Sequence, residues 1–494
     1  MEFPLMNLTD IMKTANTSPY PIELPRYNRE NTQIGIVHIG PGAFHRAHQA
    51  VYTENLMNQF GGNWAICGVS LRSATAQDIL SKQDNLYTVS ILDKDIRYQI
   101  VGAIKEILIA SEQRDLVLQR MSAETTKLIT LTITEKGYCL AADGSLDFNH
   151  DDIKHDIANA SSPVSAIGFI VESLKIRKQD NIPAFNVLSC DNVSGNGDKL
   201  RRAVLDYAGK LDPQLQLWIE KHVAFPNSMV DSITPKTEAY TVESVSKAIG
   251  CQDNWPIQRE AFTQWVISND WQGERPEWEK VGVIFTQDVE GFEKAKLKLL
   301  NCLHSTLAYL GSLAGYETVF DVTSDVNFKQ FITKLAQQEI IGSFTPPTEL
   351  NIEKYSNDII QRFLNPAIRH LLAQIACDGS QKIQIRLLPI IRDNLEQGRS
   401  TKMLCFALAC WFEFICKTVK NKEELSDPMA STFYQTTGLL SEDIATVVKS
   451  FLSIDAINAH DLLLNSQISE QIEASLTLIR QTPSTQLGAV IAKL

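Results

Sequence analysis

The hydrophobic pattern of the chain changes near residue 289, and this change constrains the fold more than any other feature. Before it, short apolar runs typical of buried strands recur at 34–39, 64–71, 87–92, 98–104, 128–134 and 185–190. Helical patterns such as 167–177 lie between several of them, so we expect a mainly parallel sheet covered by helices. The polar residues Asp93, Lys94 and Asp95 lie in the short connection between the runs at 87–92 and 98–104, which predicts a hairpin and hence a mixed sheet.

Beyond residue 289 long amphipathic segments dominate, which predicts a mainly α-helical second half. They are 293–313, 327–338, 352–376, 381–396, 401–419 and 441–452. The tryptophan-rich stretch 255–280 is interpreted as a surface connection before a last strand at 281–286. With 494 residues the chain is too long for one ordinary core, so we expect two domains, at 1–286 and 287–494.

Composition narrows the class of protein. The chain is 44% hydrophobic and 21% charged, with a net charge of −12, which argues against nucleic acid or an anionic membrane as a partner. The nine cysteines are scattered singly without a C-x-x-C pair, so we expect no zinc site and no other metal. Neither a secretory signal nor a run of 18 apolar residues is present, and the expected location is the cytoplasm.

The run 34–56 has the order strand, glycine turn, helix that typifies dinucleotide-binding domains. Gly40 can form the tight turn, and Gly42 lets the backbone approach a pyrophosphate. His45 takes the place of the third glycine of G-x-G-x-x-G, so the fingerprint is incomplete. The sequence therefore predicts an α/β, Rossmann-like, dinucleotide-binding N-terminal domain and a helical substrate-binding and catalytic C-terminal domain.

The residues after the second strand leave the choice of cofactor open. An acidic residue there would bind the ribose of NAD, but the chain has Gly68-Val69-Ser70-Leu71-Arg72. Ser70 and Arg72 could instead accept the 2′-phosphate of NADP, or Arg72 could be a solvated surface charge. We expect NAD, with NADP as an alternative.

Two further strands end in polar residues, at Glu135 to Tyr138 and at Asp191 to Val193, where ligands bind in open α/β sheets. Asn192 is a candidate ligand contact or a simple turn residue. Asp231, in 225-FPNSMVDSITPKT-237, is a candidate substrate contact or a loop cap.

The segment 293–311 aims several reactive groups in one direction. On a helix, Glu293, Lys296, Asn301 and His304 fall within an arc of roughly 140°, and Leu299, Leu303 and Leu307 flank that arc. A desolvated lysine has its charged form disfavoured, so it can act as a base. The alternative is a helix with one exposed polar face. No tyrosine is followed four residues later by lysine, and the cysteine spacing does not suit a zinc alcohol dehydrogenase. If the chain is a dehydrogenase, its base must be another residue, and Lys296 is the candidate.

Five motifs in this order resemble the polyol-specific long-chain dehydrogenases, a family that includes mannitol 2-dehydrogenase and fructuronate reductase (D-mannonate oxidoreductase). They are G-x-G-x-F-H-R-A-H-Q from Gly40, T-E-K-G-Y from Thr134, S-C-D-N from Ser189, N-S-M-V-D-x-I-T-P from Asn227 and K-x4-N-x2-H-S from Lys296. The similarity runs from about residue 34 to residue 398. It implies a metal-independent NAD(P)-dependent enzyme of carbohydrate metabolism that acts on a secondary alcohol.

The resemblance also assigns roles to residues. Lys296 matches the general acid and base, Asn192 and Asn301 match the asparagines that hold the reacting oxygen, and His304 matches a substrate-orienting histidine. Glu293 matches a proton-relaying glutamate, and Asp231 and Lys382 match substrate-pocket positions. The expected cofactor contacts are Gly40, Gly42, Phe44, Arg46, Ser70 and Glu135.

The stretch 362–389 resembles the fructuronate reductase branch, which implies reduction of D-fructuronate to D-mannonate. Arg369, Lys382 and Arg386 are available for a hexuronate carboxylate, although each could be a helix-surface charge. Oxidation of mannitol or another polyol is the alternative, and a non-catalytic nucleotide sensor is a distant one. Ser232 departs from the arginine usual in its motif. A small-molecule substrate and a monomer are expected.

Overall fold

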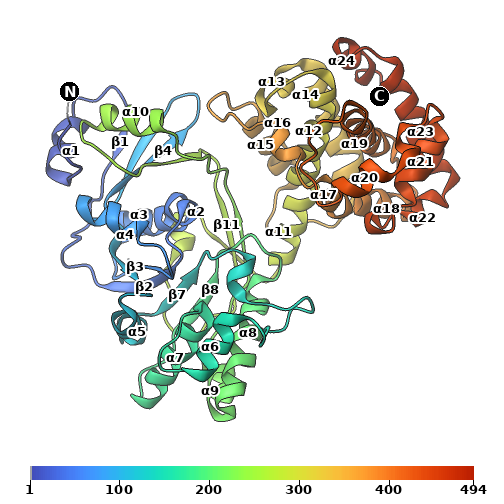
Figure 1. Cartoon of the computed structure of the whole chain (residues 1–494). Coiled ribbons are helices and arrows are strands. Elements are labelled where there is room, and N and C mark those ends of the chain that lie inside the picture. The colour runs from blue at the N-terminus through green and yellow to red at the C-terminus, as the bar shows by residue number, and fades with distance from the viewer. Residues whose placement is uncertain (1–2) are drawn as a thin grey trace. The chain divides into compact units, whose positions relative to one another are not determined.

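The computed structural model describes residues 3–494, which divide into two compact units, Met1–Glu290 and Gly291–Leu494 (Figure 1). The sequence analysis placed this division after residue 286. Within residues 3–494, no helix combines the length and the apolar character needed to cross a bilayer.

The first unit is built on a five-stranded sheet in which every neighbouring pair is parallel. Its order is β6 (Ile104–Ile109), β3 (Ala65–Ser70), β2 (Ile34–Ile39), β7 (Leu128–Leu131) and β8 (Asn186–Ser189). The chain proceeds outward from β2 to one edge and then returns to place β7 on the other side of β2. The carboxyl ends of β2 and β7 therefore form the point at which the strand order reverses, where open α/β sheets bind ligands.

Helices cover both faces of this sheet because the strand side chains alternate between two apolar clusters. Val37 and Ile39 pack with α5 (Arg114–Ser122), α7 (Ala166–Gln179) and α8 (Asn196–Leu211). Ile36 lies in the cluster that contains α3 (Gln49–Phe60). Other helices of this unit are α1 (Leu8–Ala15), α2 (Ala43–Ala47), α4 (Thr75–Leu80), α6 (Asp151–Ala158), α9 (Pro213–His222) and α10 (Ala239–Ile249). The expected Rossmann-like domain is confirmed.

Two smaller sheets complete the first unit. One has the order β1 (Ile22–Glu23), β5 (Arg97–Val101), β4 (Tyr87–Leu92), β10 (Ile257–Glu260), and the other β12 (Ile284–Thr286), β11 (Gln264–Ser268), β9 (Ser228–Asp231). The predicted hairpin is confirmed, since β4 and β5 are antiparallel. The interpretation of 255–280 as a surface connection is wrong, because this stretch supplies β10 and β11 and buries Trp265 and Trp278.

The second unit is helical, as expected. Its central helix α19 (Lys402–Asn421) packs against α12 (Cys302–Ala314) and α23 (Ser466–Gln481). The remaining α-helices are α11 (Val289–Lys296), α13 (Val319–Ser324), α14 (Val326–Leu335), α15 (Ile352–Phe363), α16 (Leu372–Ala376), α17 (Gly379–Arg386), α18 (Leu388–Glu396), α20 (Ala430–Gln435), α21 (Ile444–Leu452), α22 (His460–Leu463) and α24 (Leu487–Ile491).

Two of the predicted long helices are each divided in two. The segment 352–376 forms α15 and α16, with Pro366 in the break, because proline lacks the backbone donor that a continuing helix needs. The segment 381–396 changes from α17 to α18 at Leu387, and Pro389 lies in the first turn of α18. These breaks place α17 beside α12, where it becomes part of the site described next.

Candidate active site

Lys296 and Asn301 are joined by a π-helical turn. Lys296 is the last residue of α11, Leu297–Asn301 form a π-helix (η4), and His304 lies in the first turn of α12. A π-turn hydrogen-bonds residues five apart, so Asn301 is brought closer to alignment with Lys296 than in the plain α-helix assumed above. Leu299, Leu303 and Leu307 are fully buried, which confirms the expected anchoring of this segment.

Arg386 of α17 stabilises the π-helical turn by hydrogen bonds. Its Nη1 donates hydrogen bonds to the carbonyl oxygen of Asn301, at 3.4 Å, and to Oγ of Ser305, at 3.1 Å. α17 also packs directly on η4 and α12. Backbone groups at a departure from α-geometry need partners other than their usual ones. Arg386 supplies one, and so helps to fix the position of Asn301.

His304 is buried beside two other rings. Its ring centroid lies 4.6 Å from that of Phe363 and 5.2 Å from that of His370. Burial, followed by the nearby His370 and three cationic side chains, holds the pKa of His304 well below its ordinary value. The imidazole is therefore neutral near pH 7. In residues 3–494 its Nε2 has no hydrogen-bond partner, and a ligand hydroxyl would satisfy it.

Lys382 and Arg386 form a cationic pair beside these histidines. Nζ of Lys382 donates to the carbonyl oxygens of Cys377, at 2.6 Å, and Ile375, at 3.1 Å. Burial and the charge of Arg386 lower the pKa of Lys382, and burial lowers the pKa of Arg386. Among the residues that the structure describes, neither cation has a carboxylate within ion-pair distance. Asp378 and Asp427 act on Lys382 only from beyond ion-pair distance and raise its pKa against those two causes.

The other predicted residues of the second unit lie in different settings. Arg369 is 72% exposed and forms an ion pair of 2.6 Å with Glu317. Its guanidinium is thus already paired at the surface. Glu293 and Lys296 are both half-buried on α11.

We predict that Arg386→Met lowers kcat about 10- to 100-fold, because it would displace Asn301, which we expect to hold the reacting oxygen. The measurement is steady-state kinetics with circular dichroism as a check of folding. Arg392→Met is the matched control, because Arg392 is a neighbouring arginine that pairs with Asp461. An unchanged kcat in the Arg386 variant would contradict the bracing role.

In the first unit, the glycine turn has the features that a bound dinucleotide requires. Gly40 has a φ of +90°, and a Cβ there would lie 2.2 Å from the carbonyl oxygen of Thr132. Only glycine fits this position. A Cβ on Gly42 would meet nothing closer than 3.8 Å, so the backbone is open to an approaching phosphate. The turn thus fits a dinucleotide.

A stacked histidine pair occupies the place of the missing third glycine. The rings of His38 and His45 lie 3.4 Å apart at 14°, and His38 contacts Thr130, at 2.7 Å, and Thr132, at 2.9 Å. Burial lowers the pKa of His38 to about 3 and that of His45 well below its ordinary value. The two neutral rings can therefore stack between β2 and α2. They take the place of the third glycine, which in the standard motif lets the strand and the helix pack closely. This role of His38 was not predicted from the sequence.

The other predicted cofactor contacts differ in their accessibility. Arg46 is 2% exposed, donates to the carbonyl oxygen of Trp255, at 2.7 Å, and lies 3.8 Å from the centre of its ring. Its guanidinium is therefore occupied inside the unit. Phe44 is half-buried and stacks on His48, Ser70 ends β3, and Glu135 is exposed.

Asp191 is a site residue that the sequence analysis did not single out. Its carboxylate accepts hydrogen bonds from the backbone of Ile133, at 3.1 Å, and Thr134, at 2.9 Å, and from the hydroxyl of Tyr138, at 2.7 Å. Thr134 has a φ of +62°, which is unfavourable for a β-branched residue. Asp191 therefore holds the strained loop after β7. The exposed Asn192 follows it directly, and Asp231 is buried in β9.

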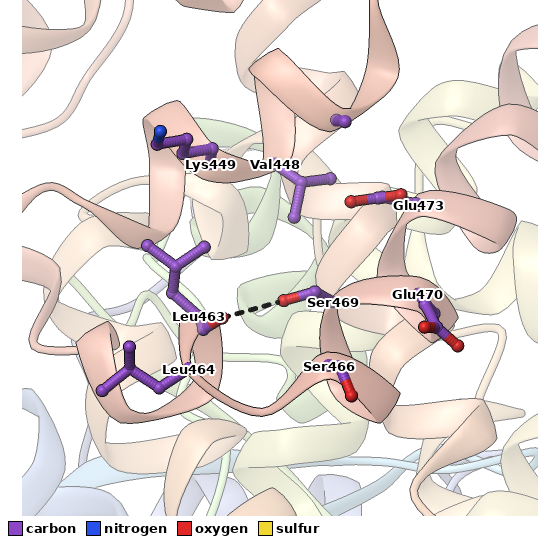
Figure 2. Close-up of a pocket in the computed structure, with 9 residues that line it drawn as sticks. Val448, Lys449, Leu463, Leu464, Ser466, Ser469, Glu470 and Glu473 are labelled. Atoms are coloured by element: carbon purple, nitrogen blue, oxygen red, sulfur yellow. Dashed lines mark hydrogen bonds between the residues drawn. The ribbon is translucent and has the colours of Figure 1, made fainter.

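A separate hollow lies among α21, α22 and α23 (Figure 2). Val448, Leu463 and Leu464 line it together with Lys449, Glu470 and Glu473, and Ser469 donates to the carbonyl oxygen of Leu463. It contains none of the predicted site residues, and we assign it no role.

Comparison with known proteins adds independent findings. The family models of the mannitol dehydrogenase Rossmann domain and C-terminal domain match residues 34–280 and 288–480. D-mannonate oxidoreductase of Escherichia coli (strain K12) is 39% identical over 472 residues, which are 94% of this chain and 97% of that protein. Mannitol 2-dehydrogenase of Aspergillus fumigatus (strain CBS 144.89 / FGSC A1163 / CEA10) is 37% identical and covers 86% of this chain and 87% of its own length.

Among solved structures, Pseudomonas fluorescens mannitol 2-dehydrogenase in a ternary complex with NAD and D-mannitol aligns with a TM-score of 0.78, 33% identity and 99% coverage of both chains. The fold and these matches define an oxidoreductase with a Rossmann domain and a helical C-terminal domain. The chain belongs to the mannitol dehydrogenase family. The resemblance stated from the sequence motifs is confirmed.

Proposed function

We propose that the protein is an NAD-dependent hexuronate reductase that converts D-fructuronate to D-mannonate. The observation that carries this proposal is the cationic pair of Lys382 and Arg386, which lacks a carboxylate partner in the described chain. A hexuronate brings a carboxylate that could pair directly with these cations, whereas a neutral polyol would leave both without an ion-pair partner. The similarity to D-mannonate oxidoreductase supports the same substrate.

Each reactive group has a proposed task. Lys296 donates a proton to the carbonyl oxygen during reduction and removes it during oxidation. Asn301 and Asn192 donate hydrogen bonds to that oxygen, and neutral His304 orients a neighbouring hydroxyl. Glu293 relays the proton to solvent, and Asp231 binds a substrate hydroxyl. The bound nicotinamide supplies the hydride for the carbonyl carbon.

The proposed cofactor is NAD, held by the turn of Gly40 and Gly42. The open backbone at Gly42 supports this, as does the bound NAD in the Pseudomonas fluorescens structure. Arg46 is a weaker candidate than the glycines because its guanidinium already has partners. We also propose that the enzyme acts as a cytoplasmic monomer.

An initial-rate panel tests the substrate. D-fructuronate, D-tagaturonate and D-fructose are offered for reduction with NADH and NADPH, and nicotinamide absorbance is followed. We expect the highest kcat/KM with D-fructuronate and NADH. A preference for D-fructose would instead support a polyol 2-dehydrogenase, the alternative that the mannitol 2-dehydrogenase relatives favour. Nucleotide binding without turnover of any sugar would favour a sensor.

We predict that Lys382→Met raises the KM for D-fructuronate by about 10- to 100-fold, because one charge-assisted hydrogen bond to the carboxylate is lost. The control is Arg369→Met, which removes an exposed cation already paired with Glu317. Equal KM values for wild type and Lys382→Met would exclude the carboxylate role of Lys382. A raised KM in the Arg369 variant would restore that residue as a substrate contact.

A further inference from the structure

An arginine just beyond β3 is paired with an aspartate from a distant part of the chain. Arg72 lies two residues after the end of β3, and its Nη2 contacts Oδ2 of Asp152 in the first turn of α6 at 2.5 Å. The side chain of Arg72 is 76% exposed and that of Asp152 is 25% exposed. From the sequence alone, Arg72 is a candidate for the 2′-phosphate of NADP, and nothing in the sequence points to Asp152 as its partner.

The end of β3 lies directly beside the glycine turn. The amide of Gly40 donates to the carbonyl oxygen of Val69 at 2.9 Å, and a Cβ on Gly68 would lie 3.1 Å from Pro41. In Rossmann domains the residues that follow this strand meet the adenosine ribose, an acidic residue favouring NAD and an arginine accommodating NADP. Arg72 is therefore placed where it could bind a 2′-phosphate.

The charges around this corner oppose such binding. Burial raises the pKa of the nearby Cys139 thiol to about 11, and the carboxylates of Asp152, Asp156 and Asp147 add to this effect, whereas Arg72 acts against it. At the Cys139 thiol, the effects of Asp152 and Asp156 are each larger than that of Arg72. An exposed ion pair is weak by itself, so Arg72 could turn toward a phosphate, but the charge of Asp152 would remain close by.

We propose that Asp152 selects NAD over NADP. Its carboxylate neutralises Arg72 and repels a 2′-phosphate. Asp152 thereby takes over the role of the acidic residue that is absent after β3. The inference rests on the proposed cofactor and concerns the adenosine part of that cofactor alone.

The test is binding of adenosine fragments, measured by isothermal titration calorimetry with the full chain. The ligands are AMP and AMP carrying a 2′-phosphate. EDTA is present, because donor atoms of Cys139, His150 and Asp152 lie within 4.8 Å of one another and could capture a trace metal. We expect Asp152→Asn to tighten binding of the 2′-phosphorylated ligand by about tenfold, with AMP affinity unchanged within about twofold.

Two controls separate this role from a general change of charge. Asp151→Asn removes an exposed carboxylate from the same helix turn and should leave both affinities unchanged. Adding Arg72→Ala to Asp152→Asn should abolish the gain. If Asp152→Asn does not fold, Asp152→Ser replaces it, since serine is small and polar and likewise removes the charge.

An unchanged affinity ratio in folded Asp152→Asn, or an equal gain in Asp151→Asn, would overturn the proposal. Failure of the proposed sugar substrate would leave these affinities unaffected, because neither fragment contains nicotinamide or sugar substrate. Binding of neither fragment would remove the cofactor assignment together with this inference.

Discussion

Replacing Lys296 with alanine is expected to lower kcat by about a hundred- to ten-thousandfold, the range typical for loss of a general acid or base. Lys296 ends α11 at the π-turn that carries Asn301, so the variant removes the proposed proton donor and leaves Asn301, the proposed oxygen-holding residue, in place. Stability and NADH affinity should stay near those of wild type, because the side chain is only half-buried.

The measurements are turnover of the preferred substrate, NADH titration by fluorescence and thermal unfolding. Lys294→Ala is the matched control, since it removes an exposed lysine from the same helix. Partial rescue of Lys296→Ala by an added primary amine would identify proton transfer as the missing step. Wild-type turnover in Lys296→Ala would refute the assignment of Lys296.

The strands could be predicted from the sequence where apolar residues occupy the whole strand. The apolar runs at 34–39 and 87–92 coincide with β2 and β4. The edge strand β6 was missed, because Lys105 and Glu106 interrupt its apolar pattern and an edge strand tolerates partly exposed side chains. The stretch 255–280 was misjudged for the opposite reason, since its prolines and tryptophans suggested a loop although Trp265 and Trp278 are buried.

The candidate site was predictable as a set of residue types but not as a geometry. The spacing of Lys296, Asn301 and His304 indicated one helical face, whereas the π-turn between them has no signal in the sequence. Its brace, Arg386, lies 85 residues beyond Asn301 and was considered only as a carboxylate partner. Asp152 was missed likewise, because its contact with Arg72 spans 80 residues. Long-range pairing of polar side chains depends on tertiary structure, which one sequence does not disclose.

Asp191→Ala is expected to destabilise the first unit by about 3–5 kcal/mol and to lower its unfolding midpoint by roughly 5–10 °C. Asp191 is 8% exposed, and its carboxylate accepts hydrogen bonds from two backbone amides and from the hydroxyl of Tyr138. Each buried donor left without a partner costs roughly 1–3 kcal/mol. Thermal or urea-induced unfolding of the full chain measures the loss.

The same variant should also weaken NADH binding, because the loop that Asp191 holds carries Glu135 and begins at the strained Thr134. Without the carboxylate acceptor, the hydrogen bond that offsets the strain of the positive φ at Thr134 is lost. The backbone of Thr134 is then expected to move to a less strained conformation. Asp180→Ala, which removes an exposed aspartate after α7, is the control and should change neither quantity. Asp191→Asn keeps one acceptor oxygen, so its unfolding midpoint and its NADH affinity should lie between those of wild type and Asp191→Ala. A midpoint for Asp191→Ala equal to that of wild type would show that the loop after β7 is held by its other contacts, and the anchoring role of Asp191 would be wrong.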